Sequence, residues 1–212
     1  MKYDLELIEP NRKIVMDAVK KTLDSPDFKI HNDELNRLFE DHNKNDDYDK
    51  VYLKVLALNT YYSAGVKSIH IMNMVKHILF VYNQKKYKDN ACLINNPSEP
   101  NDHCIKLVTE LSNLEVGVEK DGKVINKVWH YDSFASKFCF FQNNKFFFIF
   151  DSYVSELLFE FKNKFKDKYE EKFGKDFKDF TKEGLRNYDT FYIAINQFIT
   201  FFGLQSQGEF HY

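Results

Sequence analysis

The stretch "SFASKFCFFQNNKFFFIFDSYV", residues 133–154, holds eight phenylalanines and few charges. Besides Lys145, only Lys137 and Asp151 ordinarily carry charge in it. Aromatic side chains supply a large core volume from few residues, so this stretch is predicted to be buried. Lys137 and Asp151 each lie close to a serine. Either they lie at a solvated edge and cap a helix, or they are the reactive groups of a functional site.

The composition favours one helical protein with a substantial core. Of 212 residues, 43% are apolar, which excludes general disorder. Seven glycines and four prolines are few for a hairpin-rich sandwich, so helices are favoured. We expect a single domain over 1–212, in which an N-terminal helical pair at 1–47 packs on a core at 48–204.

The sequence favours a cytoplasmic location. Its three cysteines, Cys92, Cys104 and Cys139, have no CxxC spacing, which fits reduced thiols better than a disulfide framework or a zinc site. The start "MKYDLELIEP" lacks the apolar run of a secretory signal. No apolar run approaches the roughly 20 residues that a membrane span needs, so no membrane association is expected.

Apolar side chains recur with the helical period of 3.6 residues along most of the chain. The predicted helices span 11–23, 32–45, 49–66, 68–86, 101–114, 152–173 and 187–204. Asn32 or Asp33 is expected to cap the second helix, and Ser68 is available as a cap for the fourth.

A β-hairpin is predicted where "VGVEKDGKVINKVW" places two β-branched runs around Asp121-Gly122. Asp-Gly tolerates the positive φ angles of a type I′ turn. A two-stranded ribbon alone is only marginally stable, so we expect a small insertion. The predicted fold class is therefore mostly α, with a small β-hairpin.

Familiar cofactor and metal motifs are missing from the sequence. It contains no GxxxxGK[ST] phosphate loop, no GxGxxG after a strand, no HExxH and no cysteine pairs at zinc spacing. His70 and His77 lie seven residues apart, which favours a core or surface role for both. No cofactor and no metal are expected.

The charge pattern leaves two interpretations open. The formal net charge of −2 argues against a generic polyanion binder but says nothing of one face. Residues 66–150 carry 11 lysines against 8 acids. This surplus is either a basic face or a chance imbalance.

The stretch "HYDSFASKFCFFQNNKFFFIFDSYV" resembles a pattern of bacterial proteins related to 8-oxoguanine DNA glycosylases, in the helix-hairpin-helix DNA glycosylase superfamily. The shared order is Ser-x-Ala-Ser-Lys, a short aromatic helix, and an aromatic strand-like run closing on Asp-Ser. "VLALNTYYSAGVKSIHIMNMVKHI" is similar to an earlier helix–turn–helix of the superfamily, and "ITFFGL" to the end of the bacterial group. The resemblance spans roughly 50–204 and implies a helical glycosylase-like bundle.

The resemblance implies a catalytic site. Asp151 aligns with the catalytic aspartate at the start of a helix. Ser133 aligns at or beside the lysine of lyase-active members, and Lys137 lies one turn further on the same face, which makes it a candidate nucleophile. The residues implied in substrate or DNA contact are Ser133, Ser136, His130, Tyr131, Tyr61, Tyr62 and Ser63.

Each assignment has a structural alternative. An aspartate before an apolar helix is most often an N-cap, worth about 1 kcal/mol. Lys137 is otherwise a lysine whose stem packs on apolar surface, Ser133 a cap, and Tyr61 and Tyr62 core aromatics. The glycine-rich hairpin of the characterised enzymes corresponds here to "VWHYDSF", which has no glycine to bring backbone N–H groups to a phosphate.

The resemblance implies DNA binding with excision of an oxidised or otherwise modified base. A protein with this activity must first take the base out of the stack, because the glycosidic bond is shielded in a duplex. The alternative is a non-catalytic interaction or phage-defence protein that keeps the glycosylase-like fold. The sequence leaves the target base, the choice between DNA and RNA, and the oligomeric state open.

Overall fold

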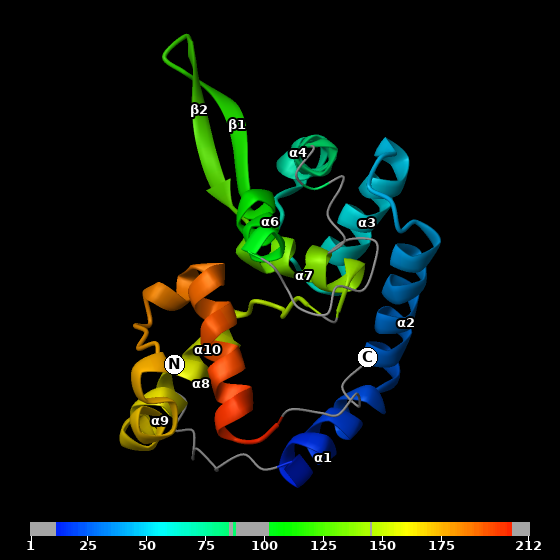
Figure 1. The fold of residues 1–212 in the computed structure, drawn as a ribbon. Helices are drawn as coiled ribbons and strands as arrows, with labels where there is room; N and C mark the ends of the chain where they lie inside the picture. The colour runs from blue at the N-terminus through cyan, green and yellow to red at the C-terminus, as the bar shows by residue number, and fades with distance from the viewer. Residues whose placement is uncertain (1–11, 85–86, 88–101, 145, 205–212) are drawn as a thin grey trace. The chain divides into compact units, whose positions relative to one another are not determined.

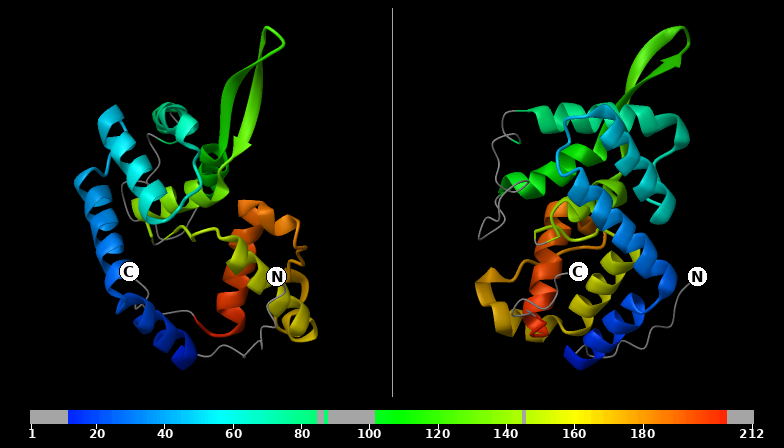
Figure 2. Two further views of the ribbon diagram at one scale, coloured as in Figure 1. Left: turned by 180° about the vertical axis from the view of Figure 1, so that it is seen from behind. Right: turned by 90° about the vertical axis from the view of Figure 1, so that its right-hand side faces the viewer.

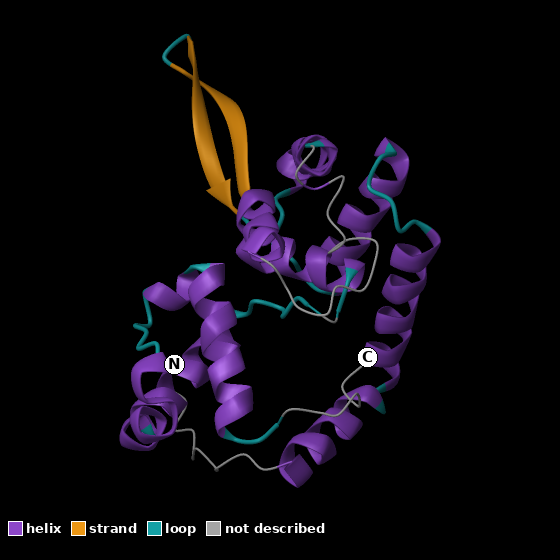
Figure 3. Ribbon diagram, viewed as in Figure 1, coloured by secondary structure: helices purple, strands orange, loops and turns teal. Residues whose placement is uncertain are grey.

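Helices dominate the protein, as the sequence predicts. In a computed structural model of the chain, residues 12–84, 87, 102–144 and 146–204 are described. Figure 1 shows their helices together with an antiparallel hairpin, which Figure 3 draws in orange. The predicted fold class, mostly α with a small β-hairpin, is confirmed.

The chain divides into two compact units. One joins the chain up to Lys29 with the segment that begins at Ser152, and the other comprises Ile30–Asp151. Every residue that the sequence offers as a site residue lies in the second unit. The single domain predicted for 1–212, with a helical pair at 1–47 on a core at 48–204, stays a prediction.

The second unit is a cluster of helices that carries the hairpin. It contains most of α2 (Pro26–Asp41), then α3 (Tyr48–Tyr61), the 3₁₀ helix η1 (Ser68–His70), α4 (Ile71–Asn83), α6 (Asp102–Ser112), β1 (Asn113–Lys120), β2 (Lys123–His130) and α7 (Asp132–Gln142). Helix α3 packs on α4 and α7, and α6 packs on α7. The core side chains include Leu35, Phe39, Val55, Leu58, Met74, Ile78, Leu107, Phe134 and Phe138.

The hairpin turn forms where the sequence predicts it. Asp121 and Gly122 have φ angles of 52° and 73°, and a type I′ turn requires positive φ at both central positions. Strands β1 and β2 pair in register from Asn113 opposite His130 to Lys120 opposite Lys123. In Figures 1 and 2 the hairpin projects beyond α4 and α6 of its own unit.

The first unit is built on aromatic packing. It contains α1 (Arg12–Leu23), α8 (Ser152–Lys164), α9 (Lys166–Phe173), the short 3₁₀ helices η2 (Gly174–Asp176) and η3 (Gly184–Arg186), and α10 (Tyr188–Phe201). Phe161, Phe165 and Tyr169 are buried against Phe201 and Phe202. The single helix predicted over 152–173 is wrong, because Phe165 leaves helical geometry at φ −116° while its ring packs in this cluster.

Other boundaries differ from the sequence prediction. Helix α2 begins at Pro26 rather than after Asn32 or Asp33, since proline fits the first turn of a helix, where its missing N–H is not needed. Ser68 lies in η1, and the residue before α4 is His70, which forms no side-chain cap. The strand-like run predicted at 146–150 is a loop, since among the described residues strand pairing occurs only between β1 and β2.

The cysteine interpretation is also corrected. Cys104 is disulfide-bonded rather than reduced. Cys139 is a free thiol buried in α7, and burial raises its pKa. The cytoplasmic location, which relied partly on reduced thiols, stays a prediction. Across the described ranges, no helix is both long and apolar enough to cross a bilayer.

Candidate functional site

Lys137 lies at the centre of the candidate site. Its side chain points from α7 into the second unit and is only 7% exposed. The Nζ atom donates hydrogen bonds to Ser133 Oγ at 3.0 Å and to the Tyr62 carbonyl at 3.2 Å. Burial lowers the pKa of Lys137, and the charge of the Asp151 carboxylate opposes that shift. The predicted Lys137–Asp151 pair is therefore within electrostatic reach.

Ser136 holds the loop that leads to Asp151. Its fully buried hydroxyl donates to the Ser133 carbonyl at 3.1 Å and accepts from the Phe150 N–H at 2.9 Å. This bond attaches the end of the aromatic loop to α7 beside Lys137. Asp151 is half-buried and directly precedes α8, the position of an N-cap.

The turn after α3 forms the other side of the site. Asn59 holds it closed, since its side chain accepts from the Val66 N–H at 3.0 Å and donates to the Val66 carbonyl at 3.1 Å. Tyr62 ends α3, and its hydroxyl donates to Asn32 Oδ1 at 3.3 Å. Ser63 has a φ of 45°, in the left-handed region that a serine seldom adopts.

Two predicted site residues sit elsewhere in the same unit. Tyr61 stacks on His31 with ring centroids 4.6 Å apart. It also lines a cavity of about 350 Å³ between α2 and α3, together with Glu34, Arg37, Leu38, Asp41, His42 and Ala57. The ring of Tyr131 is buried, and its hydroxyl is 2.6 Å from His70 Nδ1, with which it shares a hydrogen bond. These tyrosines do not join the Lys137 cluster.

The serine and histidine at the start of the stretch behave differently from the sequence expectation. The N-cap position of α7 is Tyr131, so Ser133 is not the cap; it lies inside the helix and accepts from Lys137. His130 is exposed at the base of the hairpin, where its Nδ1 is 2.7 Å from Asn113 Oδ1. That contact ties the two strand ends together and leaves His130 outside the cluster.

Sequence reasoning missed a second buried lysine, Lys54. It is completely buried in α3, and its Nζ donates to Asn45 Oδ1 at 2.8 Å and to Gln142 Oε1 at 3.4 Å. The ammonium group also lies 4.7 Å from the centre of the Phe39 ring. Burial lowers the pKa of Lys54 to about 7, partly opposed by the charge of Asp46.

A signal for Lys54 was present in the sequence. Val51, Val55 and Leu58 are buried on one stripe of α3, and position 54 falls on the same stripe at helical spacing. A lysine on a core stripe predicts either a buried amine or a helix boundary. Its partners, from a loop before α3 and from the end of α7, have no local sequence signal.

The chemistry available at the cluster is that of an amine and a carboxylate. Within the described ranges, no group of three His, Cys, Asp or Glu side chains is placed to hold a metal ion. An amine whose pKa is lowered by burial is more often neutral at neutral pH, and a neutral amine is a nucleophile. A nearby carboxylate can accept a proton or stabilise a developing cation.

These features define a mostly α-helical protein with a buried lysine–carboxylate cluster and a projecting hairpin. The family model HI_0787_N, described as an N-terminal domain, matches residues 13–146, which is more than half of the chain. The protein therefore belongs to this family. The matched segment includes Lys137 and ends before Asp151. Comparisons with curated proteins and with solved structures found no match.

Proposed function

We propose that the protein binds DNA and excises a modified base, with Lys137 as nucleophile and Asp151 as its partner carboxylate. The proposal depends on one observation. The amine of Lys137 is nearly buried, has a lowered pKa and lies within electrostatic reach of the Asp151 carboxylate, which directly precedes α8. The resemblance to bacterial 8-oxoguanine DNA glycosylase-like proteins aligns Asp151 with the catalytic aspartate. It aligns Ser133 at or beside the lysine of lyase-active members, and Lys137, one turn further on the same face, would take the place of that lysine. An oxidised base is the substrate class it favours.

The hydrogen bonds of Lys137 are compatible with a neutral amine, and its Nζ also lies 5.9 Å from the centre of the Tyr62 ring, a contact that an ammonium group makes as well. A neutral amine has two N–H donors and one lone pair, whereas an ammonium group has three donors and no lone pair. Lys137 has two acceptors, Ser133 Oγ and the Tyr62 carbonyl. Two N–H groups satisfy both of them, and the lone pair remains for attack.

The proposed reaction begins with attack of the Lys137 lone pair on C1′ of the deoxyribose. The C1′–N bond to the base breaks, its electron pair leaves with the base, and the base takes a proton from solvent water. The new secondary ammonium passes a proton to the Asp151 carboxylate. The lone pair of the resulting secondary amine then opens the C1′–O4′ bond to give an iminium ion, and O4′ accepts the proton that Asp151 holds.

Borohydride trapping tests this proposal, because borohydride reduces the iminium to a stable amine. The wild-type protein is expected to give a covalent adduct with duplexes that carry an abasic site or an oxidised base. Lys137→Gln is expected to abolish the adduct, and Asp151→Asn to slow its formation. Lys54→Met is the matched control, since it removes another buried lysine of the same unit.

Two outcomes contradict the proposal. An adduct that persists in Lys137→Gln and disappears in Lys54→Met shows that the nucleophile is Lys54 of α3 and not Lys137 of α7. A wild-type protein that neither forms an adduct nor binds duplex DNA at low salt, where phosphate contacts are strongest, is not a DNA glycosylase. Circular dichroism of each variant verifies that loss of the adduct is not loss of folding.

The second candidate is a non-catalytic protein with the same architecture. It is favoured by the low exposure of Lys137 and by its bond to the Tyr62 carbonyl, which are typical of a lysine that stabilises a helix end. In that case Lys137→Gln lowers stability and changes no activity. Base release by the wild-type protein excludes this candidate.

A further inference from the structure

The register of the hairpin separates its charges onto two faces. Residues directly opposite each other in an antiparallel pair share a face, and alternate residues along a strand do too. The face that contains Trp129, called here the lysine face, carries Leu114, Val116, Val118, Lys120, Lys123, Ile125, Lys127 and Trp129. The opposite face, the glutamate face, carries Asn113, Glu115, Gly117, Glu119, Val124, Asn126, Val128 and His130.

All the strand lysines therefore lie on one face and both strand glutamates on the other. Lys120, Lys123 and Lys127 are exposed, as are Glu115 and Glu119. No described carboxylate forms an ion pair with any of the three lysines. The hairpin as a whole carries no net charge, because its three lysines are balanced by Glu115, Glu119 and Asp121. Its strand charges are nevertheless separated, with the positive ones on one face and the negative ones on the other.

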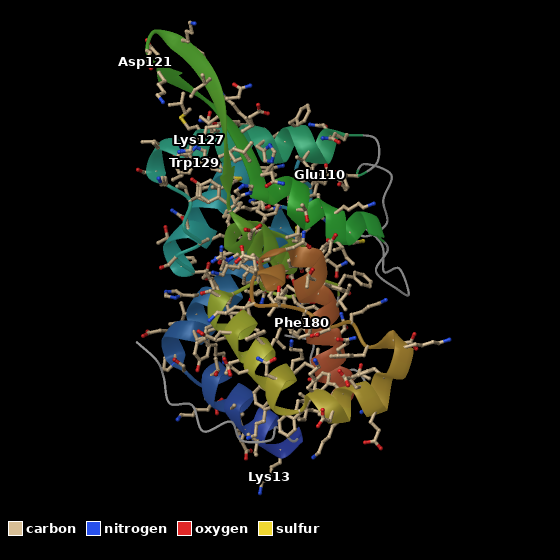
Figure 4. All side chains as sticks on the ribbon, turned by 90° about the vertical axis from the view of Figure 1, so that its left-hand side faces the viewer. Lys13, Glu110, Asp121, Lys127, Trp129 and Phe180 are labelled. Carbon is tan, nitrogen blue, oxygen red and sulfur yellow. The ribbon has the colours of Figure 1, made fainter. Side chains whose placement is uncertain are left out.

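A fourth lysine extends the lysine face at its base. Lys67, in the turn between α3 and α4, places its ammonium group 4.0 Å from the centre of the Trp129 ring, and Lys127 places its own 4.2 Å away. Figure 4 shows Lys127 and Trp129 near the base of the hairpin and Asp121 at its tip. Two cations over one ring, with no ion-pair partner among the described residues, leave a concentrated positive charge.

Buried His70 is affected by the positive charge of Lys67 and Lys127. After burial itself, the charges of Lys67 and Lys127 are what lower the pKa of His70. His70 contacts the Trp129 ring edge-on at 4.8 Å. An uncompensated positive potential is costly to the free protein and is relieved when an anion binds.

We propose that the lysine face is a contact surface for the phosphate backbone of duplex DNA. It rests on the proposed function, since base excision requires a duplex partner. A two-stranded ribbon fits the major groove of B-DNA. Exposed Val118 and Ile125 lie among the lysines of this face, where apolar side chains meet thymine methyl groups in known complexes. The turn at Asp121 and Gly122 joins the two strands at the end of the ribbon.

The test compares three hairpin variants in duplex binding over a range of salt concentrations. Lys120→Gln/Lys123→Gln/Lys127→Gln removes three cations from the exposed ribbon and is expected to weaken low-salt binding about tenfold or more. The slope of log K against log salt is expected to fall by about 2 to 3, because each phosphate that is no longer neutralised lowers it by about 0.9. The same lysines changed to Arg are expected to retain binding.

The matched control changes the other face. Glu115→Gln/Glu119→Gln makes the protein more positive by two charges and leaves the lysine face intact, so it is expected to bind as tightly as the wild type or more tightly. Equal affinity and equal salt slope for the Lys→Gln variant and the wild type overturn the inference. Wild-type binding to phosphatidylserine vesicles in place of duplex DNA also overturns it.

The failure of this inference is distinct from the failure of the proposed function. The Lys→Gln variant keeps Lys137 and Asp151, so it still forms the borohydride adduct at saturating protein if the protein is a glycosylase. If the Lys→Gln variant forms the adduct and binds the duplex with unchanged affinity, only the proposal that the hairpin contacts DNA is rejected. Lysine-dependent duplex binding without any wild-type adduct leaves the hairpin interaction standing and removes the catalytic proposal.

Discussion

The hydroxyl of Ser136 accepts a hydrogen bond from the backbone N–H of Phe150 at 2.9 Å, so α7 holds the residue directly before Asp151. The same hydroxyl donates to the Ser133 carbonyl, one turn back in its own helix. A serine that both donates and accepts inside the core fixes a loop that has no strand partner. The position of Asp151 relative to Lys137 therefore depends on the uncharged side chain of Ser136.

Ser136→Ala is expected to destabilise the protein and to slow the chemistry. It removes the side-chain acceptor of the Phe150 N–H in a fully buried place, and losing one partner of a buried hydrogen bond costs about 1–3 kcal/mol. Urea denaturation measures the loss, and the rate of borohydride trapping measures the effect on Asp151. Ser68→Ala, at an exposed serine, is the control. Equal stability of both variants contradicts the role assigned to Ser136.

Local signals in the sequence predicted much of this fold. The Asp121-Gly122 turn was found because its positive φ angles depend on two adjacent residues and nothing else. The final helix was predicted because apolar side chains recur at helical spacing over 187–204, and in the structure Asn187 caps it by accepting from the N–H groups of Asp189 and Thr190. The Ser133–Lys137 contact follows from helical spacing alone.

Features that depend on distant contacts were not predictable. The break at Phe165 comes from a ring buried against α10, and periodicity continues through it unchanged. The loop before Asp151 has the composition of a strand. Its conformation depends on a hydrogen bond from the Phe150 N–H to Ser136 of α7, which the residues of the loop do not indicate. Lys54 finds an acceptor in Gln142, which is remote in sequence.

Lys54→Met is expected to stabilise the protein most at low pH. The pKa of Lys54 is about 7 in the folded state against an ordinary value of 10.5, so between these values the unfolded state binds more protons. The free energy of unfolding of the wild type therefore rises with pH in that window, by up to about 1.4 kcal/mol per pH unit. Methionine has similar volume and no charge, so the variant lacks this slope.

Urea unfolding of both proteins from about pH 6 to about pH 9 measures the difference. The advantage of Lys54→Met should be greatest and constant below about pH 7, and should shrink as the pH rises. Lys76→Met replaces an exposed lysine on α4 and is the matched control. A difference between the wild type and Lys54→Met that is the same at every pH shows that the Lys54 amine is not held neutral by burial.

Tyr131→Phe is expected to destabilise the second unit without affecting the trapping reaction. It removes the hydroxyl that shares a 2.6 Å hydrogen bond with buried His70, at a cost of about 1–2 kcal/mol. Thermal unfolding measures that loss. Because Tyr131 lies outside the Lys137 cluster, the yield of borohydride adduct below the unfolding temperature should be that of the wild type. A lost adduct in a stably folded Tyr131→Phe variant would return Tyr131 to the site.

Ser63→Gly separates a structural role of the α3–α4 turn from a DNA-contacting one. Ser63 has a φ of 45°, and left-handed backbone costs a residue with a side chain roughly 1–2 kcal/mol. Glycine removes that cost but adds freedom to the unfolded chain, so a net gain of at most about 1 kcal/mol is expected. Asp121→Gly is a control for the melting temperature alone, since Asp121 has a φ of 52° but lies on the hairpin that is proposed to contact DNA. If the turn wedges into DNA, Ser63→Gly raises the melting temperature and binds a duplex with an abasic site more weakly than the wild type does. Binding equal to that of the wild type leaves Ser63 as a strained turn residue with no part in recognition.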